Sequence, residues 1–194
     1  MLDKKVPYAG LYMRREAGAP VPQYALPKGY RFSLYRSGDE SDWARIETSV
    51  LEFDSEFAAL LLFKEKFAPH AAELRRRCLF VEDSGGAKVA TATAWWSDVG
   101  GERRAWLLWV GVEPRRQGLG LGKAIIARAT ELLVELNGGV PLFLKTQTWS
   151  YKAIGIYRAC GFEPTDEKLL YKKGKENYRK AMRILKRLKR PSDR

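Results

Sequence analysis

The sequence has few of the residues that build metal sites, disulfide frameworks or membrane spans. Its 194 residues include two cysteines and one histidine. Cys78 and Cys160 belong to no CxxC motif and to no histidine cluster, so we expect two reduced thiols and no metal site. His70 follows Pro69 in a polar stretch, which favours a surface loop over a catalytic base. No apolar run approaches the roughly 20 residues of a transmembrane helix, and the N-terminus lacks a signal-peptide pattern. These absences predict a cytoplasmic protein with no transmembrane segment.

The positive charge is concentrated at the C-terminal end. The formal net charge is +12, and residues 172–194 hold eleven Lys and Arg against Glu176 and Asp193. Apolar residues recur there at helical spacing, which predicts an amphipathic helix over Lys175–Lys189 with one docked face. The charged face is either simply solvated or attracts an acidic partner such as RNA, a ribosome or an anionic membrane. Because no RNA-binding motif is present, a nucleic acid is the less favoured partner.

The N-terminal segment is rich in proline. Residues 1–29 contain four of the nine prolines, at positions 7, 20, 22 and 27. Proline lacks a backbone donor and restricts φ, so we expect no regular helix or central strand in this segment. We therefore predict an N-terminal extension over 1–29, a domain over 30–172, and a basic amphipathic helix and tail over 173–194. At 45% hydrophobic residues the chain has enough apolar side chains for one compact core.

Regular patterns begin at Tyr30. Alternation and turn residues predict strands, and spacings of three and four predict helices. The expected elements are strands at 30–35, 78–82, 89–96, 105–112, 142–146 and near 169–171, with helices at about 39–51, 55–67, 118–136, from 150 onward, and at 175–189.

The most informative segment runs from Trp109 to Ile126, where an apolar strand passes through a glycine-rich turn into a helix. Gly118, Gly120 and Gly122 allow a tight turn and a close approach of the backbone to a ligand. The first N–H groups of the following helix have no partner within the helix and point outward. Together they predict a cradle for a diphosphate.

The spacing distinguishes between phosphate-binding patterns. Gly122-Lys123-Ala124 lacks the hydroxyl of a Walker motif, and the glycines do not follow the Gly-x-Gly-x-x-Gly spacing of a dinucleotide fold. The pattern [Gln/Arg]-x-x-Gly-x-[Gly/Ala] is filled by Gln117, Gly120 and Gly122. In this the chain resembles the GCN5-related N-acetyltransferases (GNAT), in which this motif binds acetyl-coenzyme A. An ordinary strand-to-helix turn with incidental glycines is the alternative.

A second segment supports the resemblance. Ser150–Phe162 is similar to the second cofactor motif of the family, Asn-x-x-Ala-x-x-x-Tyr-x-x-x-Gly-Phe, with Ala153 and Tyr157 at the matching positions. Ser150 replaces the asparagine of the family, so any hydrogen bond to the pantetheine arm has a shorter reach. Gly161 is expected to end the helix.

The resemblance implies a fold and a set of roles. The fold is an α/β GNAT fold, with a central mixed, mostly antiparallel sheet flanked by helices. A backbone N–H on the strand at Val110–Val112 would polarise the thioester carbonyl, and Tyr157 would donate to the departing thiolate. The cofactor-binding residues implied for acetyl-CoA are Val110, Gly111, Val112, Gln117, Gly118, Leu119, Gly120, Leu121, Gly122, Ser150 and Ala153.

The base that removes a proton from the acceptor amine is harder to identify. The first two helices and their connection wall the acceptor pocket in the family, which makes Glu47, Glu52 and Asp54 candidates. Glu47 is preferred as the second catalytic residue beside Tyr157. A solvated charge on a helix is the alternative interpretation for each of them.

These observations predict an acetyl-CoA-dependent N-acetyltransferase in which a primary amine attacks the thioester directly. The acceptor, a small molecule or a peptide, is not identified by the sequence, and transfer of a longer acyl group is open. A homodimer is possible, since dimers are common in the family. The rival hypothesis is a noncatalytic module of the same fold that uses the basic tail to hold RNA or a protein.

Overall fold

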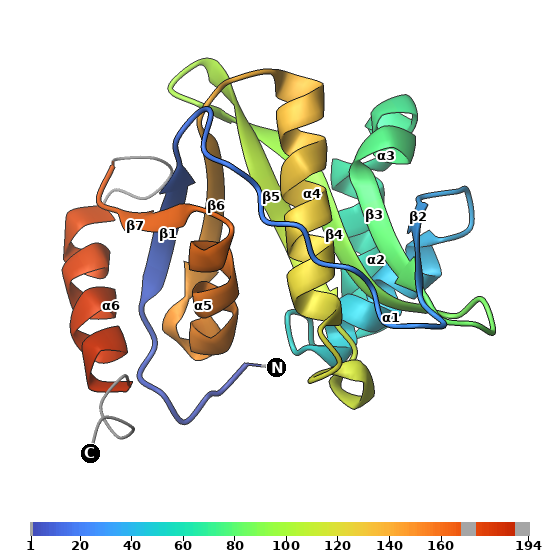
Figure 1. Cartoon of the computed structure of the whole chain (residues 1–194), viewed down its shortest axis with the longest axis horizontal. Coiled ribbons are helices and arrows are strands. Elements are labelled where there is room, and N and C mark those ends of the chain that lie inside the picture. The colour runs from blue at the N-terminus through green and yellow to red at the C-terminus, as the bar shows by residue number, and fades with distance from the viewer. Residues whose placement is uncertain (1, 168–173, 189–194) are drawn as a thin grey trace.

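The computed structural model describes residues 2–167 and 174–188, and these form a seven-stranded mixed sheet with helices on both faces (Figure 1). The strand order is β2-β3-β4-β5-β6-β1-β7. Neighbouring strands are antiparallel except for β5 and β6, which are parallel and are joined through α4. This arrangement confirms the predicted fold class.

The helices and strands of the described residues have the following bounds. The strands are β1 (Gly10–Arg15), β2 (Arg31–Leu34), β3 (Cys78–Glu82), β4 (Lys88–Val99), β5 (Glu102–Val112), β6 (Leu142–Gln147) and β7 (Phe162–Thr165). The helices are α1 (Glu40–Ser49), α2 (Glu56–Lys66), α3 (Ala71–Arg77), α4 (Leu121–Asn137), α5 (Tyr151–Ala159) and α6 (Gly174–Leu188).

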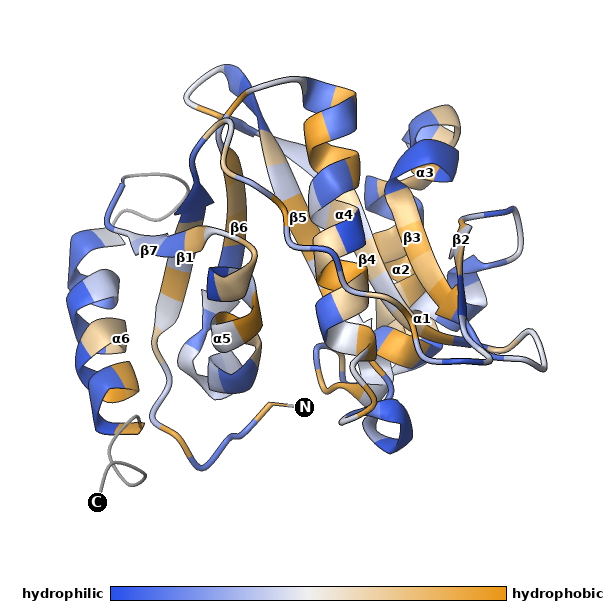
Figure 2. Cartoon of the chain, in the orientation of Figure 1, coloured by the Kyte–Doolittle hydropathy of each residue, from blue (hydrophilic) through white to orange (hydrophobic). Residues whose placement is uncertain are grey.

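Side chains that alternate along the strands supply a core to each face of the sheet. On one face, Trp43 of α1 and Phe63 of α2 pack with Phe80 and Trp95 from the sheet. On the other face, α4 and α5 pack against a larger cluster that includes Leu79 and Leu107. Figure 2 shows the hydrophobic character of the central strands and the alternation of polar and apolar residues around α4.

The expectation that the N-terminal segment contains no central strand is wrong for residues 10–15. β1 lies between β6 and β7 and pairs with both. The prolines at positions 7, 20, 22 and 27 flank this stretch and do not interrupt it, so the proline content of the whole segment concealed a short strand. Residues 16–30 do run over the surface, across the outer side of α4 (Figure 1).

Other elements differ from the predictions in detail. α4 begins at Leu121 and not at Gly118, because Gly118 and Gly120 have φ values of 83° and 86°, outside the helical region. The short helix α3 was not predicted, and His70 is the residue that precedes it. The strand expected near 169–171 lies outside the described residues, while β7 at Phe162–Thr165 was missed.

Helix α6 agrees with the predicted amphipathic helix. Ala181 is fully buried, Tyr178 and Leu185 pack against the core, and the helix lies along β1. Lys and Arg occupy the opposite side, and none of them forms an ion pair within residues 2–167 and 174–188. None of the helices in the described part of the chain is long and apolar enough to cross a membrane.

The position of β1 makes a testable prediction for stability. Met13 is fully buried in the middle of β1, so Met13→Ala should lower the free energy of unfolding by about 2–5 kcal/mol. The measurement is urea denaturation of the full chain. The control is Glu16→Ala, an exposed position directly after β1, which should change stability by less than about 0.5 kcal/mol. Equal effects of the two variants would show that β1 is not part of the cooperative core.

Candidate functional site

The strand β5 contains an irregularity at the start of the predicted motif. Thr93 of β4 faces Leu108, whereas Thr91 faces Gly111, so two residues of β5, Trp109 and Val110, oppose one residue of β4. This is a β-bulge. Trp109 has a φ of 51°, one of two positive values for a non-glycine residue in the described chain. The bulge redirects the backbone of β5 before it reaches the glycine-rich turn.

β5 and β6 separate beyond this point. They pair at three positions only, from Ala105 with Leu142 to Leu107 with Leu144. β5 continues to Val112 and β6 to Gln147, and no strand of the described residues fills the gap between them. The edge of β5 that carries Val110, Gly111 and Val112 is therefore left without a strand partner on the β6 side. The sequence predicted that these residues lie on a strand, and in the structure one edge of that strand faces the gap.

The glycine-rich turn lies at the end of the same strand, where α4 begins. Gly118 and Gly120 both have positive φ, and an added Cβ at either would meet no atom within 4 Å. The backbone N–H groups from Gly118 to Gly122 form no hydrogen bond within the described residues. Free N–H groups at a helix N-terminus favour an anion, so the predicted diphosphate cradle has the donors that it requires.

The remaining residues of the motif pack the turn against its neighbours. Gln117 donates from Nε2 to the carbonyl oxygen of Val112 at 2.9 Å and so holds the turn against β5. An added Cβ at Gly122 would lie 3.7 Å from Ile156 Cδ1, an ordinary contact, so α4 and α5 approach closely here without needing glycine. Leu121 is buried and Leu119 is 47% exposed beside the free N–H groups.

Helix α5 brings the second motif to the gap. Ser150 is the N-cap residue of α5, and its side chain makes no capping hydrogen bond. Ala153 packs against the core beside Ile156. Tyr157 is buried, and burial, followed by the charges of Glu52 and Glu47, raises the pKa of its hydroxyl well above the ordinary value. Tyr157 therefore keeps its proton over the whole neutral range.

Glu47 lies directly against the bulge. It is fully buried on α1, and an added Cβ at Gly111 would lie only 3.0 Å from its Oε1 atom. Neither carboxyl oxygen has a hydrogen-bond partner in the described part of the chain. Burial, with a smaller contribution from the charge of Glu52, raises the pKa of Glu47 well above its ordinary value. An unpaired buried carboxyl group is costly, and such groups concentrate at functional sites.

The structure thus brings most of the predicted residues together around one gap: the Val110–Val112 edge, the turn, Tyr157 and Glu47. The contact between Trp109 and Phe53 was not predicted from the sequence: their rings stack with centroids 5.2 Å apart and hold the α1–α2 loop against the bulge. Nothing in the local sequence marks the bulge, because Trp109 is a residue that an ordinary strand accommodates. Within the described residues no group of three or more His, Cys, Asp or Glu side chains is arranged to hold a metal ion.

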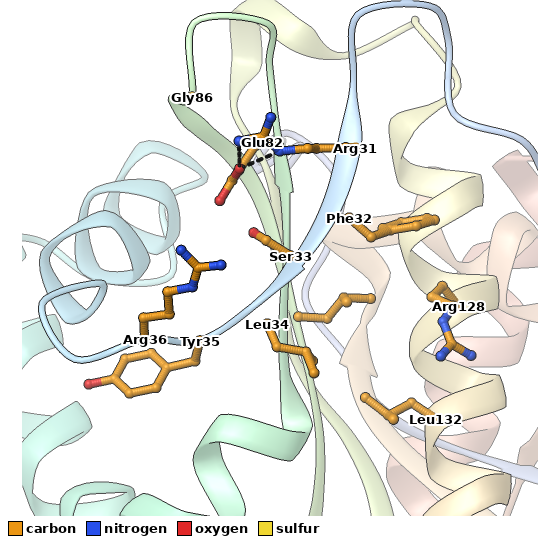
Figure 3. Close-up of a pocket in the computed structure, with 11 residues that line it drawn as sticks. Arg31, Phe32, Ser33, Leu34, Tyr35, Arg36, Glu82, Gly86, Arg128 and Leu132 are labelled. Carbon is orange, nitrogen blue, oxygen red and sulfur yellow. Dashed lines mark hydrogen bonds and ion pairs between the residues drawn. The ribbon is translucent and has the colours of Figure 1, made fainter.

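A surface cavity lies elsewhere, at the other end of the sheet. It has a volume of about 670 Å³ and lies between β2 and α4 (Figure 3). Phe32, Leu34 and Leu132 line its apolar part, and Arg31 at its edge pairs with Glu82. None of the predicted site residues lines this cavity. The gap between β5 and β6 is therefore the candidate site on chemical grounds.

Comparison with known families agrees with the motifs and with the geometry. The model of the acetyltransferase (GNAT) family matches residues 40–162, which include the bulge, the glycine-rich turn and the whole of the second motif. The chain belongs to this family. The resemblance found from the two sequence motifs is confirmed.

Curated proteins that match the chain are distant relatives. Mycothiol acetyltransferases from Salinispora arenicola and from Streptomyces bingchenggensis are 27% and 26% identical to the GNAT chain over 168 and 167 residues. The matches cover 77% and 82% of this chain but 50% and 53% of the relatives. The chain therefore spans about half the length of these relatives.

Solved structures share the fold. A GCN5-related N-acetyltransferase from Sphaerobacter thermophilus superposes with a TM-score of 0.65 at 19% identity, over 82% of this chain and 49% of that one. One from Ralstonia eutropha JMP134 superposes with a TM-score of 0.57 at 18% identity, over 72% of this chain and 96% of that one. A tandem GNAT protein from the clavulanic acid biosynthesis pathway has a TM-score of 0.56 at 18% identity, over 84% of this chain and 52% of that one.

The buried carboxyl group makes stability depend on pH. The pKa of Glu47 is higher in the folded protein than its ordinary value of 4.5. Above pH 4.5, Glu47 therefore binds more protons in the folded state than in the unfolded state. Its contribution to the free energy of unfolding is complete below pH 4.5 and is lost as the pH rises through the pKa of the folded state. Glu47→Gln mimics the neutral acid, so its stability relative to the parent should increase as the pH rises from about 4.5 to 8.

The measurement is the urea midpoint of the two proteins across this range. Glu65→Gln, at an exposed position on α2, is the matched control and should follow the parent at every pH. A difference between Glu47→Gln and the parent that is constant with pH would contradict the raised pKa.

Proposed function

We propose that the chain is an acetyl-CoA-dependent N-acetyltransferase that transfers the acetyl group to a primary amine by direct attack. The observation that carries the proposal is the combination of the β5 bulge, the gap between β5 and β6, and the free N–H groups at the start of α4. The three features lie along one continuous stretch of chain, from Trp109 to Gly122. These residues would hold an elongated thioester cofactor, with the N–H groups of the strand edge available to the thioester and those of the helix N-terminus available to the anionic diphosphate.

The residues present fit the cofactor. Gly118 and Gly120 leave open space where side chains would stand, and the N–H groups from Gly118 to Gly122 would bind the diphosphate. Ser150 and Ala153 on the opposite wall would contact the pantetheine arm. When bound, acetyl-CoA supplies an acetyl group activated as a thioester.

The proposed chemistry uses the edge of β5 and Tyr157. A backbone N–H of Val110–Val112 would donate a hydrogen bond to the thioester oxygen and stabilise the negative charge that develops there. The acceptor nitrogen would form the C–N bond as the C–S bond breaks, and the second proton of that nitrogen would pass to the departing sulfur to give free coenzyme A. Tyr157 would stabilise the departing sulfur with a hydrogen bond. Its raised pKa favours this role over full proton donation, because a weaker acid transfers its proton less readily.

Glu47 is the proposed base. An acceptor amine is mostly protonated at neutral pH and must lose a proton before its nitrogen can attack. Transfer to a carboxylate costs less when the pKa of the carboxyl group is closer to that of the amine, and the pKa of Glu47 is raised in this direction. Its position against Gly111 places the carboxyl group beside the strand edge that would bind the thioester.

A noncatalytic binding module is the second candidate. The observation in its favour is the outer side of α6, where six Lys and Arg residues form no ion pair within the described residues. A positively charged face of this kind attracts polyanions such as RNA in a salt-dependent manner. Absence of thiol release with every acceptor tested, together with tight salt-dependent RNA binding, would favour this candidate.

The proposed diphosphate cradle predicts that a methyl group added at Gly120 weakens acetyl-CoA binding. Gly120→Ala places a side chain among the free N–H groups and should weaken acetyl-CoA binding by about tenfold or more, a loss of roughly 1.4 kcal/mol. Isothermal titration calorimetry measures this. Gly138→Ala is the matched control, since Gly138 also has positive φ and open space but lies at the other end of α4. Both variants should lose about 1 kcal/mol of stability, and only the first should lose affinity. Equal affinities would contradict the proposed cradle.

Tyr157→Phe tests the leaving-group donor. Removal of the hydroxyl group should lower kcat by about 10- to 100-fold and leave the Kd for acetyl-CoA nearly unchanged, because the effect arises in the transition state. The assay follows release of free coenzyme A with a thiol reagent. Tyr151→Phe, also on α5 but outside the buried core, should keep the parent rate. An unchanged kcat in Tyr157→Phe would remove Tyr157 from the mechanism.

A further inference from the structure

The loop between α1 and α2 is held against the site in a strained conformation. Only Leu51 and Trp109 among the described non-glycine residues have positive φ, with values of 70° and 51°. Leu51 lies in this loop, and Phe53, two residues later, stacks on Trp109 at an interplanar angle of 26°. Such conformations persist only where the surrounding structure holds them, and they cluster at functional sites. The residue between Leu51 and Phe53 is Glu52.

Glu52 connects the loop to the far side of the gap. Its backbone N–H donates to the carbonyl oxygen of Glu47 at 3.1 Å. Its side chain accepts a hydrogen bond from Nε2 of Gln147, at the end of β6, at 3.3 Å. Because β6 forms the side of the gap opposite β5, the carboxylate of Glu52 lies at the opening. Glu52 is exposed and forms no ion pair within residues 2–167 and 174–188.

Glu47 and Glu52 therefore lie on one side of the gap and differ in how deeply they are buried. Glu47 is the buried, unpartnered carboxyl group against Gly111, and Glu52 lies at the solvent edge. Burial is the main cause of the raised pKa of Glu47 and of Tyr157, and the charge of Glu52 adds to it in both cases.

We infer that Glu52, positioned by Gln147, binds a second cationic group of the acceptor, so the acceptors are amines that carry a further positive charge. One amine would reach Glu47 and Gly111, and the other cation would remain at the opening with Glu52. This inference rests on the proposed function and adds the class of acceptor, a diamine or a related dication. Exposed carboxylates held by a neighbouring amide are suited to this role, because they bind a cation without a large desolvation cost.

Three four-carbon amines test the inference: 1,4-diaminobutane, n-butylamine and 4-aminobutanoate. The group at the far end is positive in the first, uncharged in the second and negative in the third. Release of free coenzyme A is measured at saturating acetyl-CoA for the parent, for Glu52→Gln and for Asp54→Asn. Asp54 is the matched control, because it is exposed in the same loop and has no hydrogen bond or ion pair in the described chain.

In the parent, we expect kcat/KM to be about tenfold or more higher for 1,4-diaminobutane than for n-butylamine, mainly through KM, and lowest for 4-aminobutanoate. Glu52→Gln should abolish the preference by raising KM for the diamine, with little change for n-butylamine. Asp54→Asn should keep the parent order. These results would support the inference, since a merely structural role of Glu52 would affect all three probes alike.

The outcomes separate the two proposals. If calorimetry shows no binding of acetyl-CoA, the proposed function fails. If acetyl-CoA binds but the diamine and n-butylamine are equally good acceptors, or Glu52→Gln keeps the preference, the inference is overturned and the proposed function stands. Binding of acetyl-CoA without turnover of any probe would also overturn the inference, because a diamine site must acetylate a diamine.

Discussion

The bulge at Trp109 and Val110 is the feature on which the rest of the candidate site depends. It interrupts the ladder between β4 and β5 and gives Trp109 a positive φ. Such a backbone is costly for a large aromatic residue, and the Trp109 ring is held by stacking on Phe53 and by an edge contact with Trp43. The packing between the sheet and the α1–α2 layer therefore maintains the backbone that faces the gap.

The same packing explains why Glu47 is buried. α1 lies across β5 at the bulge, and Gly111 has no side chain to keep the carboxyl group away. A carboxyl group without a hydrogen-bond partner is destabilising when it is charged, so burial raises the pKa of Glu47. The folded protein therefore loses stability when Glu47 ionises. Burial is the main cause of the raised pKa of Glu47 and of Tyr157, and the charge of Glu52 adds to both.

Much of the fold was predictable because its signals are local. The strand at 78–82 and the helix over α2 follow from alternation and from helical spacing, and Ser55 caps α2 through a hydrogen bond to the N–H of Ala58. β1 was missed because six residues without proline were judged together with the proline-rich segments around them. Its place between β6 and β7 depends on pairing with residues more than 125 positions away, which no local pattern specifies.

The sequence by itself determined the family and the cofactor motifs, because glycines at fixed spacing are required wherever the backbone must turn tightly beside an anion. It also identified Tyr157 and Glu47 as candidates. Only the tertiary structure decided that Glu47 is buried against Gly111, that β5 and β6 separate, and that Glu52 reaches Gln147 across the opening. Burial and long-range contacts arise when distant segments pack together, and their effect on a carboxyl group has no counterpart in the local sequence.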